Sequence, residues 1–178
     1  MGVTYTANSG KTYERIAEAS PGTGSTTIDI TSISQSYTDL MVVCSTSRNA
    51  TGAGARGVNI YFNNDSGTNQ YGYSYLEYSQ GSTPTADSNQ YLSGQGGNAM
   101  DRNSPGTGWT LYINDYKNTT FEKNYISHLY RFQNGSYAFY QYTSRWKSTA
   151  AINRITITEP FEGFISGDKV TVYGILGA

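Results

Sequence analysis

The chain has 178 residues, a formal net charge of −1 and only 14% charged residues, yet it contains 17 tyrosines. This length is typical of one domain, and the aromatic content is too high for a disordered chain. The charge balance argues against nucleic acid or an anionic membrane as the main ligand, because both favour strongly basic surfaces. The composition therefore indicates one globular domain that functions by touching other surfaces.

We expect neither a targeting signal nor a disulfide bond within the chain. No apolar run is long enough for a membrane span, and the N-terminus lacks the basic and apolar regions of a secretion signal. Cys44 has no second cysteine to pair with, and its apolar neighbours predict a buried side chain. We expect an N-terminal arm at residues 1–11 and a single domain at residues 12–178.

The pattern along the chain is β throughout, with short alternating or apolar runs separated by Gly, Asn, Asp, Ser and Pro. About ten strands are expected, near Tyr13–Ala19, Thr26–Thr31, Asp39–Ser47, Val58–Asn63, Tyr71–Tyr78, Trp109–Asn114, Asn124–Gln133, Tyr137–Trp146, Ile152–Thr158 and Lys169–Ile175. Because no crossover helices lie between them, the sequence predicts a single antiparallel β-sandwich, jelly-roll-like, with an irregular barrel as the alternative. Residues 80–108, rich in Gly, Ser, Asn and Pro, are expected to form a flexible loop region.

The pair Asn134-Gly135 predicts a two-residue hairpin turn, since Asn-Gly is the preferred pair for a type I′ turn. The resulting register sets Gln133 opposite Ser136, Phe132 opposite Tyr137 and Tyr130 opposite Phe139. One face then carries Ile126, His128, Tyr130 and Phe132 against Tyr137, Phe139, Gln141 and Thr143, and the other carries Tyr125, Leu129 and Arg131 against Ala138, Tyr140 and Tyr142. Both faces are aromatic, so we expect one to be core and the other to lie under the 80–108 loop or a partner subunit.

Basic residues concentrate in one part of the chain. Residues 117–154 hold six basic residues and one acidic residue, whereas residues 1–101 hold four basic and eight acidic ones. Lys and Arg at solvated strand edges explain this pattern. Complementary patches between copies of the chain, or against an acidic shell, are the alternative.

The sequence gives little support for catalysis or metal binding. His128 is the one imidazole, and no Cys or His cluster could bind structural zinc. The segment Asn63–Gly67 loosely resembles the start of a calcium loop, but an Asx-turn explains the same residues. Asp115, Glu159 and Glu162 could supply the carboxylate pair of a glycosidase. With thirteen acidic residues in the chain, such pairs also arise by chance. We therefore expect no enzyme, no cofactor and no metal.

Seven short motifs follow one another along nearly the whole chain. They are Tyr13-Glu14-Arg15-Ile16; Ile28-Asp29-Ile30; Tyr37-Thr38-Asp39-Leu40-Met41-Val42-Val43; Ile60-Tyr61-Phe62-Asn63-Asn64-Asp65; Ile113-Asn114-Asp115-Tyr116 with Lys123; Trp146 before Ile152-x-x-Ile155-x-Ile157; and Gly167-Asp168-Lys169-Val170-Thr171-Val172-Tyr173-Gly174-Ile175. This series resembles the small virion structural proteins of tailed bacteriophages, of marine and cyanobacterial type. In those proteins a YTDL, an xFNxD and a terminal xYGI recur in that order.

The resemblance implies a jelly-roll-like β-sandwich displayed on the virion, commonly as a homotrimer. The chain has no long N-terminal repeat before the sandwich, which favours a capsid decoration (cement) protein over a tail fibre. The resemblance thus implies assembly in the host cytoplasm, a place on the capsid surface, and two partners: the major capsid protein and further copies of the chain. A tail fibre or receptor-binding protein that recognises a host surface glycan is the alternative.

Contact residues are expected where Tyr and Arg coincide with the N-terminal arm and the aromatic hairpin, because these residue types dominate interface hot spots. The expected partner contacts are Tyr5, Arg131, Tyr140 and Tyr142. For the glycan-binding alternative, Trp109 and Trp146 would be the stacking platforms if they are exposed.

Overall fold

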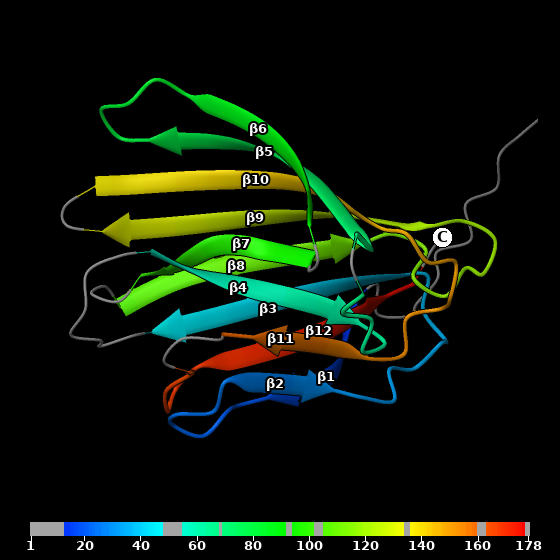
Figure 1. Ribbon diagram of the computed structural model, residues 1–178. Helices are drawn as coiled ribbons and strands as arrows, with labels where there is room; N and C mark the ends of the chain where they lie inside the picture. The colour runs from blue at the N-terminus through cyan, green and yellow to red at the C-terminus, as the bar shows by residue number, and fades with distance from the viewer. Residues whose placement is uncertain are drawn as a thin grey trace, which may run out of the picture.

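The computed structural model describes residues 13–47, 55–67, 69–91, 94–101, 105–133, 136–159 and 163–176. These residues form twelve strands in two antiparallel sheets (Figure 1). The strands are β1 (Tyr13–Ala19), β2 (Thr27–Ile30), β3 (Asp39–Ser47), β4 (Ala55–Phe62), β5 (Tyr71–Ser79), β6 (Thr85–Tyr91), β7 (Gly94–Asp101), β8 (Pro105–Ile113), β9 (Lys123–Gln133), β10 (Ser136–Trp146), β11 (Ile155–Thr158) and β12 (Lys169–Ile175). Among these residues no helix could cross a membrane. The expected all-β fold is confirmed.

The two sheets differ in width. The large sheet has eight strands in the order β1-β12-β3-β8-β9-β10-β5-β6, and the small sheet has four in the order β2-β11-β4-β7. In Figure 1 the small sheet lies in front of one part of the large sheet, whereas β10, β5 and β6 rise above it. Both sheets twist and face each other, so the predicted antiparallel β-sandwich is confirmed.

The chain alternates between the sheets in an ordered way. When the hairpin β5-β6 and the run β8-β9-β10 are each counted as one unit, consecutive units from β1 to β12 lie in the large and the small sheet by turns. This alternation is compatible with the jelly-roll-like arrangement expected from the sequence, which stays a prediction. The hairpins β5-β6 and β9-β10 both add to one edge of the large sheet and make it twice as wide as the small one.

All ten strands expected from the sequence are present, three of them with the expected bounds. The prediction of a flexible loop at residues 80–108 was wrong, since this region contains β6, β7 and the start of β8. Backbone hydrogen bonds hold β6 against β5 and β7 against β4, so these strands form without an apolar pattern of their own. The expected N-terminal arm, residues 1–11, lies outside the described residues.

The core lies between the sheets and follows the period-2 alternation of the strands. In β3 the buried side chains are Leu40, Val42 and Cys44, each separated from the next by a half-buried residue. Cys44 is buried as predicted, and the loss of hydration raises the pKa of its thiol far above the ordinary value. The small sheet contributes mainly the Ile, Val and Phe side chains of Ile28, Ile30, Val58, Ile60, Phe62, Ile155 and Ile157.

Where the large sheet extends past the small one, tyrosines take over the inner face. Tyr142 packs against Tyr75 and Tyr73, with ring centroids 5.4 and 5.8 Å apart, and against Tyr140 at 6.2 Å. The backbone of β7 also contacts β9, β10 and β5 from across the sandwich. Large rings and a close strand therefore substitute for the missing strands of the small sheet.

Candidate functional site

The hairpin β9-β10 has the register that the sequence predicted. Ser136 pairs with Gln133, Tyr137 with Phe132 and Phe139 with Tyr130. The Asn134-Gly135 turn itself lies outside the described residues. On the other side of β10, Phe139 pairs with Tyr78, so strands β5, β10 and β9 place three aromatic residues in one row across the sheet.

One face of this hairpin is core and the other is exposed. The buried side chains are Tyr125, Leu129, Ala138, Tyr140 and Tyr142. We call the opposite surface, formed by β6, β5, β10 and β9 on the side away from the small sheet, the open face. The 80–108 region does not cover the second aromatic face as one of the two expectations had it, because β7, within that region, lies over the inner face rather than over the open face.

Exposed rings gather at one end of the open face. Tyr78, Tyr130 and Tyr137 are 49%, 61% and 65% exposed. Tyr78 and Tyr130 flank the half-buried Phe139, whose ring centroid lies 5.1 Å from that of Tyr130 and 6.5 Å from that of Tyr78, and Tyr137 lies two residues before it in β10. His128 stacks on the same phenylalanine at 5.9 Å. We call Tyr78, His128, Tyr130, Tyr137 and Phe139 the aromatic patch.

Beside the aromatic patch the open face is hollowed into a groove. Two adjoining hollows, of about 440 and 580 Å³, share the lining residues Ser74, Ser88 and Thr143. These three residues form one row across β6, β5 and β10, since Ser74 pairs with both Ser88 and Thr143. The lining continues with Leu76, Ala86 and Gln141 toward the aromatic patch, and with Gly72, Asn124 and Arg145 away from it.

The groove offers neutral polar groups that the fold itself does not use. Within the described part of the chain, the side chains of Ser74, Gln141 and Thr143 make no hydrogen bond. The charged residues of the lining already have partners: Arg145 lies 3.4 Å from Glu122, and the carboxylate of Asp87 accepts a hydrogen bond from the Ser88 N–H at 2.7 Å. Neutral polar groups therefore predominate in the groove, and Asp87 supplies a carboxylate at its margin.

Two of the four expected partner contacts are not on the surface. Tyr140 and Tyr142 are 4% and 2% exposed, so the prediction that they contact a partner is corrected. The sequence showed that both hairpin faces are aromatic, but the small sheet and β7 decide which face is buried. Tyr5 lies outside the described residues. Arg131 pairs with Ala138 in the ladder, and its side chain is also outside them.

The expected stacking platforms are in the core. Trp109 and Trp146 are 1% and 2% exposed, so neither can stack on a ligand at the surface. The indole of Trp146 instead packs against Phe62 at 5.5 Å and donates a hydrogen bond to Asp65 Oδ2 at 2.8 Å. The condition under which Trp109 and Trp146 would be stacking platforms is therefore not met.

The loop Asn63–Gly67 is a structural corner in which the side-chain oxygens of Asn63 and Asp65 accept hydrogen bonds from the fold. Asp65 Oδ1 accepts the Gly67 N–H at 3.1 Å, which is an Asx-turn, while Oδ2 takes the Trp146 indole. Asn63, at a positive φ of 53°, accepts the N–H groups of Asn153 and Arg154. The Asx-turn interpretation of this segment is confirmed.

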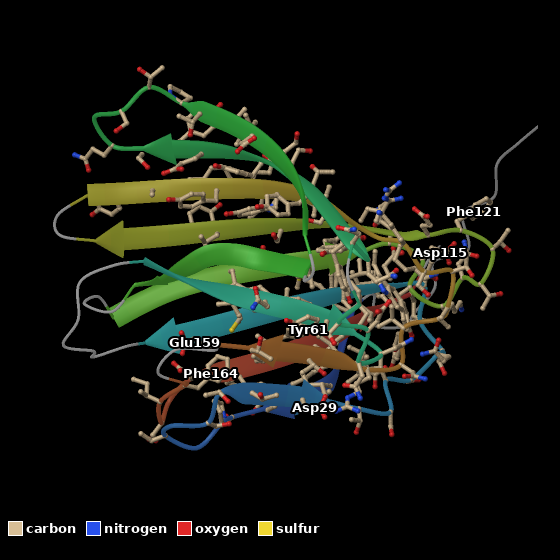
Figure 2. The ribbon with its side chains drawn as sticks, in the orientation of Figure 1. Asp29, Tyr61, Asp115, Phe121, Glu159 and Phe164 are labelled. Carbon is tan, nitrogen blue, oxygen red and sulfur yellow. The ribbon has the colours of Figure 1, made fainter. Side chains whose placement is uncertain are left out.

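The candidate catalytic residues are not brought together. Figure 2 shows Asp115 and Glu159 toward opposite ends of the sandwich, and Glu162 lies outside the described residues. Glu159 is fully buried and accepts a hydrogen bond from the Gly163 N–H at 2.5 Å, so it holds a turn. His128 faces Gln141 across the ladder and stacks on Phe139. The described residues contain no group of three His, Cys, Asp or Glu side chains that could hold a metal ion.

Several of the basic residues of segment 117–154 have partners within the chain. Arg154 binds Asp29 through two nitrogens, at 2.7 and 2.5 Å. Figure 2 shows Asp29 on β2 of the small sheet. Lys123 is buried and donates to the carbonyls of Asn118, Phe121 and Thr149, at 2.5, 3.0 and 3.1 Å. Burial lowers the pKa of this ammonium. These residues hold loops and strands together, and they form no basic patch.

The sequence grouped the open-face residues of β9 and β10 on one face, but it did not show that this face is the exposed one, and it did not reveal the groove. The groove depends on the pairing of β5 with β10, which are far apart in sequence and joined by no turn. Along β5, Ser74, Leu76 and Tyr78 alternate with Tyr73, Tyr75 and Glu77. The face with fewer tyrosines is the exposed one, and this alternation was the signal that the sequence offered.

Comparison of the chain with protein family models, with curated proteins and with solved structures found no match. The features of the chain that bear on its function are therefore the open face and the series of sequence motifs.

Proposed function

We propose that the chain is a capsid decoration protein of a tailed bacteriophage that binds the outer surface of the major capsid shell through the aromatic patch. The observation that supports this most is the gathering of Tyr78, Tyr130 and Tyr137 around Phe139 on one exposed sheet face. Contiguous exposed apolar surface on a soluble domain commonly marks a contact site. The series of motifs shared with virion structural proteins supports the choice of partner.

The patch has the properties of a docking surface. Its rings are anchored by the sheet ladder and by each other, so little side-chain freedom is lost when a partner covers them. The Tyr137 backbone is fixed further, because its carbonyl accepts the Gln80 N–H at 2.9 Å and its own N–H donates to Gln80 Oε1 at 3.3 Å. Covering the rings would contribute about 25 cal/mol per Å² of apolar area removed from water.

Decoration requires binding alone. A copy that contacts two shell subunits opposes their separation, because the second contact is intramolecular once the first is made. Many copies then add up to a large resistance against internal pressure even where each interface is modest. The homotrimer and the location on the virion belong to this proposal, together with the exclusion of an enzymatic role.

The copy number in purified particles of the encoding phage tests the proposal. Decoration predicts a number of copies comparable to that of the major capsid protein, and it predicts that particles without the chain release their DNA at a lower temperature. Absence of the chain from the particles, or a copy number that is a small fraction of the capsid protein's, would overturn the proposal. A small copy number located at the tail by labelling would favour the tail-fibre alternative.

A further inference from the structure

We infer that the groove of the open face binds a neutral oligosaccharide. This inference goes beyond the proposed role in the capsid and does not depend on it. Because both proposals use the Tyr78 ring, an oligosaccharide and the shell would compete for that end of the aromatic patch. It concerns the hollows lined by Ser74, Ser88 and Thr143, and the end of the aromatic patch that adjoins them.

The size of the groove suits a short chain-like ligand. Its two hollows measure about 440 and 580 Å³, within the range of roughly 300–1,000 Å³ that ligand sites of proteins have. Because both hollows share Ser74, Ser88 and Thr143, a ligand can continue from one into the other. The groove runs over paired strands rather than loops, so its floor is already in place before a ligand arrives.

The lining matches the chemistry of sugar hydroxyls. Each hydroxyl of Ser74 and Thr143 and the amide of Gln141 can both donate and accept hydrogen bonds, as sugar hydroxyls can. None of these three side chains has a hydrogen-bond partner among the described residues. A ligand rich in hydroxyl groups can therefore bind them without breaking any contact within the chain.

The aromatic patch supplies the second element of such a site. Leu76 and Gln141 lie in the row between the groove floor and the row of Tyr78, Phe139 and Tyr130. Successive rows on one face are about 7 Å apart along a strand, so a ligand of a few sugar rings that lies on the floor reaches the Tyr78 ring. The negative face of an aromatic ring attracts the C–H groups of a pyranose ring.

The charges argue for a neutral ligand over an anionic one. The one basic residue in the lining, Arg145, has Glu122 beside it at 3.4 Å, and the lining also contains Asp87. A phosphate backbone or a sulfated glycan would need unpaired Lys or Arg side chains. Within the described lining there are none.

Glycan binding by the purified full chain tests the inference. The probes are neutral tri- to hexasaccharides, such as glucans, mannans and galactans, and a matched sulfated and sialylated set, first on an array and then by calorimetry. We expect saturable binding of at least one neutral chain and none of the anionic set. No binding of any neutral probe at millimolar concentration, or binding only to anionic glycans, would overturn the inference.

Blocking variants locate the site. Ser74→Trp and Thr143→Trp place a large ring in the groove at exposed strand positions, so both should fold and weaken binding by at least about tenfold. Thr27→Trp, at an exposed position on the small sheet, is the matched control and should bind as the native chain does. Equal binding by all three variants would contradict the assigned site, and circular dichroism confirms that each one is folded.

Discussion

The two faces of the β9-β10 hairpin have similar compositions and opposite fates. Tyr140 and Tyr142 on the inner face are 4% and 2% exposed, whereas Tyr130 and Tyr137 on the open face are 61% and 65% exposed. The difference arises from what lies opposite, because β7 and the inner tyrosines of β5 cover one side and no described strand covers the other. A count of aromatic residues therefore says little about binding until the covered face is known.

The inner face also shows why tyrosine, rather than phenylalanine, lies at the margin of the core. Tyr140 donates to Glu77 Oε1 at 2.8 Å, and Tyr71 donates to the Asp65 carbonyl while accepting the Phe62 N–H, both at 2.9 Å. Each ring is buried while its hydroxyl reaches a polar group. Removal of these rings should cost stability, and removal of the outer rings should not.

Tyr142→Ala should produce the largest effect. The side chain is buried among Tyr73, Tyr75 and Tyr140, so its loss should lower the free energy of unfolding by about 3–5 kcal/mol. Tyr130→Ala, on the open face, is the matched control and should change it by less than about 0.5 kcal/mol. Urea unfolding of both variants gives the comparison, and similar losses would remove the distinction between the two faces.

Gly174→Ala should have the next largest effect. A Cβ at this position would lie 2.3–2.6 Å from ring carbons of Tyr37, whose hydroxyl is held by Glu14 at 2.7 Å. The ring has to move, so we expect a loss of about 1–3 kcal/mol in the free energy of unfolding. In a Tyr37→Ala background the same substitution should cost almost nothing, and an unchanged cost there would show that the ring is not the cause.

Asp29→Asn should have a smaller and pH-dependent effect. Hydrogen bonds from Arg154, followed by that from Thr156, hold the pKa of Asp29 below its ordinary value. Its contribution is therefore present above the unfolded pKa and is lost as the pH falls through the folded pKa. Because both partners are about one-third exposed, we expect less than about 1 kcal/mol at neutral pH. Urea unfolding should show the native chain and the variant converging as the pH falls below the ordinary pKa of an aspartate, and a constant difference would contradict this role.

The residues that set local pairing were predictable from the sequence. Asn134-Gly135 predicted the hairpin register, since a two-residue turn fixes every pair that follows, and the apolar neighbours of Cys44 predicted its burial. Strands with an apolar or aromatic pattern of their own could be located in this way.

The features that depend on distant pairing could not be predicted. β6 and β7 are rich in Gly, Ser, Asn and Gln and are strands because β5 and β4 supply their hydrogen bonds. The groove exists because β5 adds to β10 across a long sequence separation. The burial of Trp109, Trp146, Tyr140 and Tyr142 likewise depends on how the two sheets pack. The local sequence pattern does not determine this packing.

The double variant Tyr130→Ser/Tyr137→Ser should also have only a small effect on stability, because it removes two rings of the aromatic patch and leaves the core intact. Its free energy of unfolding should stay within about 1 kcal/mol of the native value. Tyr13→Ser, another exposed tyrosine that lies in β1 at the far edge of the large sheet, is the matched control.

The most direct test of the capsid-binding proposal is co-sedimentation of these proteins with particles that lack the chain. The native chain and Tyr13→Ser should saturate the particles with the same affinity, whereas the folded double variant should bind at least about tenfold more weakly. Full binding by the double variant, or no binding by the native chain, would contradict the proposal that the aromatic patch docks on the shell.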